Sequence, residues 1–573
     1  MTSPLTSDSS DMTQPNPSTA EARVIADELH RHGVGYAVIS PGSRSAALAI
    51  ALDEHPGIET RVILDERSAA FHALGRSRVS SVPTVALCTS GTALANYLPA
   101  VIEADLTLVP LIVISADRPP ELLHVGANQT IDQVRIFGER TRWFCNLPAA
   151  DVSRDWNAYW RTTVSQAAAR SLGQGNRPGP VHLNVAFREP TVPVADDGRS
   201  SADSYPHSIE GRPGGACWQD HHQARPGPAA LPPLDAKRGL LVAGEGDFDP
   251  TALRHAAHRL HWPVLGTAAS GLRGEDVVTT YHHLLVDDVP SWLRPDLVVT
   301  VGRIGPSDRL AALTALEIPQ IQIDRWGSWN DPRRHSTQVI QADPVATLAS
   351  IEGESNDEFL ASWVVANATM RGSLDDRLAE DDEPSGPSVA RSLSTIDLEF
   401  LVAASSMPIR DVDAHTVHRG RVIANRGASG IDGFVSTALG VASAGHRTVA
   451  LAGDLSLLHD AGGFIVDQPG NIVFVVIDNG GGGLFDLLPQ AEYAPGFERL
   501  FVTPHGLDLS VLAEAYGLRS VVIDRMSGLA QSIAGMIESH GAQVVVVPVE
   551  RETDLKLRRA LDDTARVVCA GLS

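Results

Sequence analysis

Short apolar runs alternate with longer amphipathic stretches along nearly the whole chain. The first runs cover residues 37–40, 61–64, 84–88 and 111–115, and a second group covers 240–243, 264–266, 297–301 and 320–323. A third group covers 422–424, 448–452, 472–477 and 544–549. Apolar runs this short, separated by helix-length segments, are typical of buried parallel strands with crossover helices. The pattern predicts an α/β fold built from doubly wound parallel sheets.

Two breaks in this rhythm divide the chain into three predicted domains. Residues 198–236 are rich in Gly, Pro, Ser and His, and residues 381–388 read DDEPSGPS, so both segments are predicted linkers. The domains are then expected at 18–197, 237–380 and 389–573, after a disordered tail at 1–17. We expect the first helix to begin at Ser18, with Glu21 completing a capping box, and to stop near Gly33.

Composition and charge narrow the classes of function. The 573 residues are 43% hydrophobic and 20% charged, as in proteins with several packed cores, and the net charge is −23. A chain with this negative charge is not expected to bind nucleic acid or anionic membranes, because like charges repel. The four cysteines lie far apart, and no apolar run reaches the roughly 18 residues of a membrane span. We therefore expect a cytoplasmic protein without disulfides.

Candidate chemistry lies where predicted strands end, because ligands of parallel sheets bind beyond the carboxyl ends of the strands. Asp454 follows the run 448–452, and Asn479 follows the run 472–477. A carboxylate and an amide oxygen at neighbouring strand ends suit a hard cation such as Mg²⁺. The glycines at 480–483 would let a diphosphate approach the backbone. A Gly-Asp pair alone is more simply a tight turn, but the pair with the glycine run is more specific.

This spacing resembles the metal–diphosphate motif of thiamine-diphosphate enzymes. Further blocks resemble one family among them, the 2-succinyl-5-enolpyruvyl-6-hydroxy-3-cyclohexene-1-carboxylate synthases of menaquinone biosynthesis. The blocks are PGSRS at 41–45, TSGTA at 89–93, ANQT at 127–130 and NRGASGIDG at 425–433. The resemblance implies a pyrimidine-binding domain, a central Rossmann-like domain and a diphosphate-binding domain, and it is weak in the central one.

The resemblance assigns cofactor roles to individual residues. Glu66 matches the glutamate that binds the pyrimidine N1′ of thiamine diphosphate and so promotes loss of the thiazolium C2 proton. Ile431 matches the bulky residue that holds the cofactor bent, although an Ile more often simply packs in a core. The implied cofactor-binding residues are Gly91, Ser429, Gly430, Ile431, Gly453, Asp454, Leu455, Ser456, Asn479, Leu484 and Phe485. The metal, Mg²⁺ or Mn²⁺, would be held by Asp454, Asn479 and Gly481.

The implied reaction is a transfer between 2-oxoglutarate and isochorismate. Decarboxylation of 2-oxoglutarate would yield a four-carbon carbanion that adds to isochorismate in conjugate fashion. The two substrates bring four carboxylates, which suit the planar fork of arginine. The implied substrate-binding residues are Ser43, Arg44, Arg118, Asn128, Gln129, Ser406, Arg410, Arg426 and Leu488, with Arg309 as a further candidate. The family layout also implies a homodimer or homotetramer whose active sites are shared between subunits.

Three alternatives stay open on the sequence alone. Another thiamine-diphosphate 2-oxoacid decarboxylase, or an acetolactate-synthase-like enzyme, would share Glu66, Asp454 and Asn479. A nucleotide-binding oxidoreductase would explain Gly244-Glu245-Gly246, but Asp249 stands where the fingerprint needs a third glycine. A catalytically inactive binding protein is disfavoured by the intact cofactor motif.

The histidine pairs and the central domain carry no motif with an assigned function. His221–His222 and His282–His283 lack a third ligand at metal spacing, so we expect them to be solvated.

Overall fold

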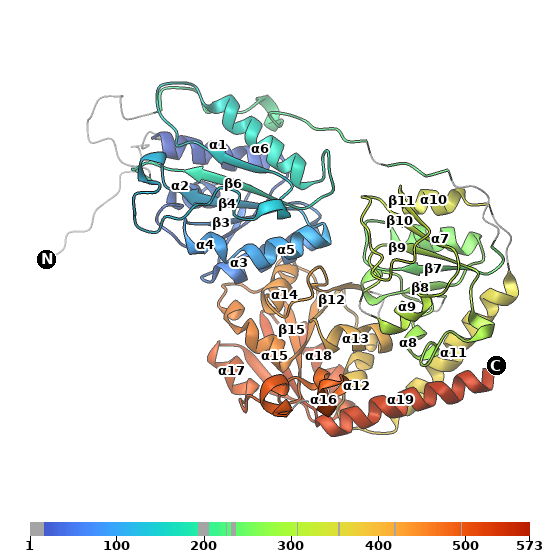
Figure 1. The fold of residues 1–573 in the computed structure, drawn as a ribbon. Coiled ribbons are helices and arrows are strands. Elements are labelled where there is room, and N and C mark those ends of the chain that lie inside the picture. The colour runs from blue at the N-terminus through green and yellow to red at the C-terminus, as the bar shows by residue number, and fades with distance from the viewer. Residues whose placement is uncertain are drawn as a thin grey trace. The chain divides into compact units, whose positions relative to one another are not determined.

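The computed structural model describes residues 16–192, 205–224, 226–230, 236–274, 276–305, 307–352, 356–417, 420–493 and 495–572. These residues form three sheets, and every strand pair within them is parallel (Figure 1). The predicted α/β class is therefore confirmed. Contacts group the described chain into two compact units. Unit 1 comprises the described residues up to Gln223 with Val435–Ala444 and Asp460–Gln468, and unit 2 comprises the rest.

The predicted tail at 1–17 lies almost wholly outside the described residues, as do parts of the predicted linker at 198–236. The three domain boundaries stay a prediction.

Unit 1 contains a six-stranded sheet in the order β2-β1-β3-β4-β6-β5. Its strands are β1 (Tyr36–Ile39), β2 (Glu59–Val62), β3 (Thr84–Cys88), β4 (Leu111–Asp117), β5 (Phe144–Leu147) and β6 (Pro180–Ala186). Its helices are α1 (Pro17–Arg31), α2 (Ala46–Asp53), α3 (Glu66–Ser80), α4 (Thr92–Ala95), α5 (Leu98–Thr107) and α6 (Asn157–Ser171). The central strands β3, β4 and β6 are buried along their whole length, as strands covered on both faces must be.

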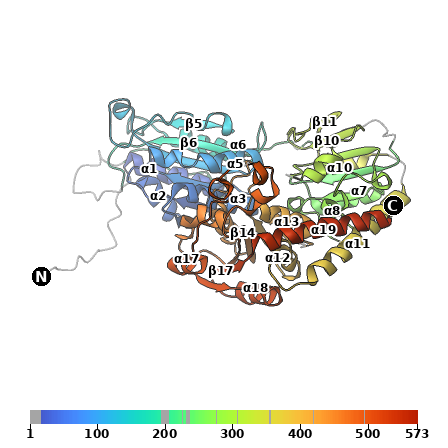
Figure 2. The ribbon, with the colours of Figure 1, turned by 60° about the horizontal axis from the view of Figure 1, so that its bottom comes forward.

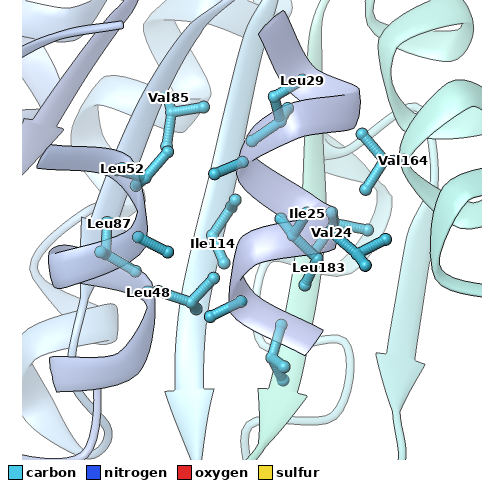
Figure 3. Close-up of a cluster of buried hydrophobic side chains, with 14 of the residues drawn as sticks. Val24, Ile25, Leu29, Leu48, Leu52, Val85, Leu87, Ile114, Val164 and Leu183 are labelled. Atoms are coloured by element: carbon cyan, nitrogen blue, oxygen red, sulfur yellow. The ribbon is translucent and has the colours of Figure 1, made fainter. Parts of the chain in front are cut away.

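Alternate side chains of this sheet supply two separate cores. On one face α1, α2 and α6 pack on the sheet, and Figure 3 shows Leu48 near Leu87 on one side of this cluster and Val164 near Ile25 on the other. On the other face α3 and α5 pack on residues of the opposite parity, such as Ala86 and Val113. Burial of both faces holds the strand register, and with it the positions of the residues at the strand ends.

The first helix begins earlier than predicted. The N-cap of α1 is Asn16, whose side chain accepts a hydrogen bond of 2.8 Å from the backbone N–H of Thr19. Ser18 instead lies inside the helix, and Glu21 is fully buried. The expected capping box is therefore wrong. The helix ends as predicted, with Gly33 just beyond it at φ 83°.

A buried charge network ties α1 to α6 and to residues of the segment 205–224. Glu28 is fully buried and lies 2.8 Å from the guanidinium of Arg161, while the backbone N–H of Trp218 donates to it at 2.6 Å. Burial alone would raise the pKa of Glu28. Hydrogen bonds from His32, Trp218 and Arg161 outweigh burial and lower the pKa to about 2.

Glu28→Gln is expected to lower the free energy of unfolding by about 2 kcal/mol, because Arg161 loses a charged hydrogen-bond partner. The folded-state pKa is depressed, so this contribution is present above pH 4.5 and is lost as the pH falls toward 2. Urea unfolding at pH 7 and pH 3 measures it, and the difference between variant and wild type should shrink at pH 3. Glu54→Gln, on an exposed side chain, is the matched control and should change stability by less than about 0.5 kcal/mol. Equal effects of both variants would contradict the assignment.

Unit 2 contains the other two sheets. The five-stranded sheet has the order β11-β10-β9-β7-β8, and the six-stranded sheet has the order β13-β12-β14-β15-β17-β16. The first consists of β7 (Gly239–Ala243), β8 (Val264–Gly266), β9 (Leu297–Val301), β10 (Gln320–Asp324) and β11 (Gln338–Gln341). The second consists of β12 (Phe400–Ala403), β13 (Arg421–Ile423), β14 (Thr448–Gly453), β15 (Ile472–Asp478), β16 (Arg519–Val522) and β17 (Ala542–Pro548).

The helices of this part of the chain cover both sheets and connect them. They are α7 (Pro250–Arg259), α8 (Tyr281–Leu284), α9 (Asp308–Leu313), α10 (Pro344–Ser350), α11 (Asp357–Ala379), α12 (Gly386–Ser392), α13 (Met407–His415), α15 (Asp454–His459), α16 (Gln490–Tyr493), α17 (Leu509–Ala515), α18 (Leu529–Ile537) and α19 (Arg551–Leu572). The helix α14 (Phe434–Ala442) comes from the same part of the sequence, but all of its residues after Phe434 belong to unit 1. The last helix, α19, follows the third sheet in the chain but runs beside α11, and Leu561 joins the core of the middle sheet (Figure 2). Within the described residues, no helix is both long enough and apolar enough to cross a membrane.

Candidate functional site

The ends of β14 and β15 bring Asp454 and Asn479 to one edge of the third sheet. The two strands are parallel and in a register that pairs Gly453 with Ile477, so the residues that follow lie side by side. Asp454 is the first residue of α15 and is 2% exposed. Its Oδ1 accepts a hydrogen bond of 2.6 Å from the N–H of Leu455, and its Oδ2 accepts one of 2.7 Å from the N–H of Gly481.

Gly481 is required where it stands. Its φ of 146° is one that side-chain-bearing residues rarely adopt, and an added Cβ would lie 2.3 Å from the carbonyl oxygen of Val502. The neighbouring Gly482 donates to the same carbonyl at 2.7 Å. The glycine run therefore forms a tight loop that directs a backbone N–H at the Asp454 carboxylate.

The groups at this edge fit a cation. Burial raises the pKa of Asp454, and the negative charge of Asp478 adds to the rise. Asp454, Asp478 and His505 offer ligand atoms that all lie within 4.8 Å of one another. The Oδ1 of Asn479 is buried and has no hydrogen-bond partner among the described residues. A divalent ion would compensate the buried carboxylate and give this oxygen a partner.

Glu66 is the first residue of α3, in unit 1. The helix is capped by Asp65, which accepts a hydrogen bond of 3.0 Å from the N–H of Ser68. A second carboxylate, on the buried Asp460, lies 3.6 Å from the Arg67 guanidinium and accepts from the Ser68 hydroxyl at 3.3 Å. Glu66 itself is half-buried, and its negative charge adds to the burial that raises the pKa of the Cys88 thiol.

Four of the predicted substrate and cofactor residues meet at the carboxyl ends of β1, β3 and β4. Arg118 follows β4 and donates to the hydroxyl of Ser90, which follows β3. Ser90 in turn donates to the carbonyl oxygen of Gln129 at 3.0 Å, and Gln129 returns a hydrogen bond of 2.9 Å to the Ser90 carbonyl. Gly91 is packed against Gln129, with φ 86°. Burial and the positive charge of Arg44 lower the pKa of Arg118.

This arrangement makes a place for an anion. Arg118 has no carboxylate oxygen within 4 Å among the described residues, and two neighbouring guanidinium groups repel each other unless an anion lies between them. Arg44 lies 3.1 Å from Glu189 and donates to the carbonyl of Phe187, also at 3.1 Å. Ser43 is adjacent to Arg44, and its carbonyl lies 3.5 Å from the hydroxyl of Thr191.

In unit 2, Arg410 and Arg426 line one recess together with residues of the middle sheet. Arg410 on α13 donates to the carbonyl of Ser406 at 2.7 Å. Ser406 itself has φ 78° and precedes the helix. The recess is also lined by His282, Arg303 and Asp413. Arg309 does not line this recess and pairs with Asp562 of α19 at 3.4 Å.

The remaining predicted residues range from exposed to buried. Ile431 is 36% exposed, so packing in a core does not account for it. Ser429 has φ 63° and is exposed, and Gly430 is half-buried. Leu455 is half-buried and Ser456 is buried. Asn128 is exposed, whereas Leu484, Phe485 and Leu488 at the short turn Gly483–Leu487 are half-buried.

Comparison with known proteins identifies the family. Residues 20–136 match the protein-family model described as "Thiamine pyrophosphate enzyme, N-terminal TPP binding domain". Residues 412–562 match the model described as "Thiamine pyrophosphate enzyme, C-terminal TPP binding domain". The 2-succinyl-5-enolpyruvyl-6-hydroxy-3-cyclohexene-1-carboxylate synthase of Thermobifida fusca is 41% identical, across 96% of this chain and 99% of its own. Synthases of the same name from Saccharopolyspora erythraea and Halobacterium salinarum are 38% and 36% identical, over 94% and 96% of this chain.

The chain belongs to this synthase family. The predicted resemblance is confirmed, and the protein is a thiamine-diphosphate-dependent enzyme. Family membership favours the synthase over another thiamine-diphosphate decarboxylase, over a nucleotide-binding oxidoreductase and over an inactive binding protein. The roles of the individual residues in this synthase-family chain stay predictions.

The expectation of solvated histidines is only partly right. His222 is 89% exposed, but His283 is 6% exposed, and His282 lies 2.9 Å from Asp413 of α13. Asp413 also accepts hydrogen bonds from the Tyr281 hydroxyl and, at 2.5 Å, from the N–H of Ala268. These contacts join residues more than 130 positions apart, so the spacing of residues in the sequence could not predict them.

Two residues near the site were missed by the sequence analysis. Gln133 is 1% exposed and accepts from the N–H of Gly91 at 2.8 Å, while it donates to Asn184 at 2.7 Å. It holds the turn after β3 against the sheet. His505 lies beside Asp454. It does not follow a strand, so the rule that ligand-binding residues follow strand ends did not predict it.

Gly481→Ala is expected to weaken metal-dependent binding of thiamine diphosphate at least tenfold, because its Cβ would collide with Val502 and displace the N–H that Asp454 accepts. Isothermal titration with Mg²⁺ and thiamine diphosphate measures the effect. Gly372→Ala is the matched control, since a Cβ there meets open space. Wild-type affinity in the Gly481 variant would show that this loop does not form the cation site.

Proposed function

We propose that this chain catalyses the synthase reaction of its relatives, with 2-oxoglutarate and isochorismate as substrates and thiamine diphosphate and Mg²⁺ as cofactors. The observation that carries the proposal is the near full-length identity to the named synthases, of up to 41% in the relatives cited above. The product would be 2-succinyl-5-enolpyruvyl-6-hydroxy-3-cyclohexene-1-carboxylate, in menaquinone biosynthesis. Mn²⁺ would also suit the oxygen ligands proposed below.

The metal would be held by the side chains of Asp454 and Asn479 and by the backbone of Gly481. The buried Asp454 carboxylate and the unsatisfied Asn479 oxygen support this assignment. When bound, thiamine diphosphate supplies an electron sink for the pair left by decarboxylation of the 2-oxoacid. Glu66 would bind the pyrimidine N1′ through its carboxylate and hold a proton there, and Ile431 would support the cofactor with its exposed side chain.

The carboxylates of the substrates would be bound by arginines. Arg118 and Arg410 each lack a carboxylate partner within 4 Å among the described residues, so both guanidinium groups keep hydrogen-bonding capacity for a ligand. Local capture of this kind is needed because the chain has a net charge of −23, which repels anionic substrates at long range.

We also propose that the enzyme is a homodimer or homotetramer of the cytoplasm. Glu66 and Asp454 belong to different compact units, and the family layout pairs these two domains from different subunits. All four cysteines are free thiols, which agrees with a reducing compartment.

The direct test follows the absorbance of isochorismate in the presence of Mg²⁺ and 2-oxoglutarate, with and without thiamine diphosphate. Loss of absorbance that requires both the cofactor and 2-oxoglutarate would support the proposed reaction. Carbon dioxide release without loss of isochorismate would assign a different acceptor.

Glu66→Gln is expected to lower turnover at least about a hundredfold with little change in the unfolding temperature, because an amide cannot hold the pyrimidine N1′ in its protonated form. Steady-state rates in the isochorismate assay measure this. Glu59→Gln, at the first residue of β2 and on a 51% exposed side chain, is the control and should keep wild-type turnover. Near-normal turnover in the Glu66 variant would remove Glu66 from the proton transfer.

Arg410→Ala is expected to raise the KM for one of the two substrates about tenfold or more, since a charged hydrogen bond to a carboxylate is lost. Separate titrations of 2-oxoglutarate and isochorismate identify which substrate it binds, and we expect 2-oxoglutarate. Arg447→Ala, on a 42% exposed side chain, is the control. Unchanged KM values for both substrates would place Arg410 outside the substrate site.

A further inference from the structure

His505 lies at the proposed metal site but belongs to none of the motifs that define it. Its Nε2 lies 3.4 Å from Oδ2 of Asp454 and 3.8 Å from Oδ1 of Asp478. The side chain is 10% exposed, and Nε2 is buried without a hydrogen bond of good geometry among the described residues. A buried imidazole nitrogen between two carboxylates is costly unless it serves as a donor or meets a ligand.

The turn that carries His505 is fixed to the glycine loop. It follows the helical turn Glu498–Val502, whose last carbonyl accepts the hydrogen bond of Gly482, and it includes Thr503 and Gly506 with φ of 47° and 62°. His505 is therefore held in place by the same loop that directs Gly481 at Asp454. The backbone of this turn therefore fixes the position of His505 beside the Asp454 carboxylate.

The other ring nitrogen decides which role the imidazole can take. The backbone N–H of Leu507 donates to Nδ1 of His505 at 3.1 Å, so Nδ1 is an acceptor and carries no proton. The neutral ring must then carry its proton on Nε2, the nitrogen that faces the carboxylates. A metal ligand at Nε2 would need the opposite tautomer and would lose the Leu507 hydrogen bond.

We propose that His505 is a positioning residue that directs Nε2–H at Oδ2 of Asp454 and so orients this carboxylate for the metal that carries the diphosphate. Oδ2 would then receive two donors, from Gly481 and from His505, which fixes the plane of the carboxylate. Outer partners of this kind set the affinity of a metal site although they do not touch the ion. This inference rests on the proposed function, because it takes Asp454 as a metal ligand.

The test measures Mg²⁺-dependent binding of thiamine diphosphate to the full chain, by isothermal titration at a fixed cofactor concentration. His505→Leu removes the donor but keeps the bulk of the side chain, and we expect the Mg²⁺ concentration for half-saturation to rise at least about tenfold. His505→Gln keeps a donor near the place of Nε2, and its half-saturation should stay within about threefold of wild type. His222→Leu, at an 89% exposed histidine, is the matched control.

Electron spin echo spectroscopy of the enzyme loaded with Mn²⁺ and thiamine diphosphate separates positioning from direct ligation. We expect no coupling from a metal-bound imidazole nitrogen in the wild type, and such a coupling would overturn the proposal. Equal Mg²⁺ dependence of His505→Leu and wild type would also overturn it. If Asp454→Asn abolishes binding while His505→Leu does not change it, only the role of His505 fails. If the wild type binds no cofactor in an Mg²⁺-dependent way, the metal assignment fails as well.

Discussion

The buried carboxylate of Asp454 is the constraint on which the site depends. A charged group 2% exposed is tolerated only when donors or a cation compensate it. Burial keeps the pKa of Asp454 raised although the backbone N–H groups of Leu455 and Gly481 donate to it. The parallel register of β14 and β15 places this carboxylate beside Asn479, and the glycine loop brings Gly481 against it. This edge of the third sheet therefore fits the divalent ion that we propose, and an ion of that charge would favour a diphosphate.

The sheet edges could be predicted because their signal is local. Each of the twelve apolar runs coincides with a strand to within two residues. Most of these strands are buried on both faces, and burial of this kind needs a continuous run of apolar residues. Asp454 and Asn479, which follow β14 and β15, could then be found from the ends of these runs. The roles of Glu66, Gly91 and Arg118 came from the family resemblance. The strands missed include β5 and β16, whose residues are partly exposed and whose runs are broken by polar side chains.

What could not be predicted depends on contacts between distant parts of the chain. Asn16 replaced Ser18 as the cap of α1, and Glu21 on the same helix became a core residue, because the packing of α1 on α6 decides which side faces inward. The contact between His282 on α8 and Asp413 on α13 likewise depends on tertiary packing, here between two helices of unit 2. The role of Glu28 likewise follows from Arg161 and from residues beyond 205, which no periodicity in α1 reveals.

The acidic character of the chain and the anionic substrates of its proposed reaction can both be accommodated. A net charge of −23 lowers the local concentration of an anion at long range, but the effect is screened beyond about 8 Å at physiological ionic strength. Close to a guanidinium that has no carboxylate oxygen within 4 Å, such as that of Arg118 or Arg410, the local positive field would dominate. Binding strength then comes from short charged hydrogen bonds, and the surface charge mainly slows the approach of the substrate. An acidic surface is thus compatible with tight, specific capture of carboxylates, provided that the arginines are kept away from the acidic residues that outnumber them.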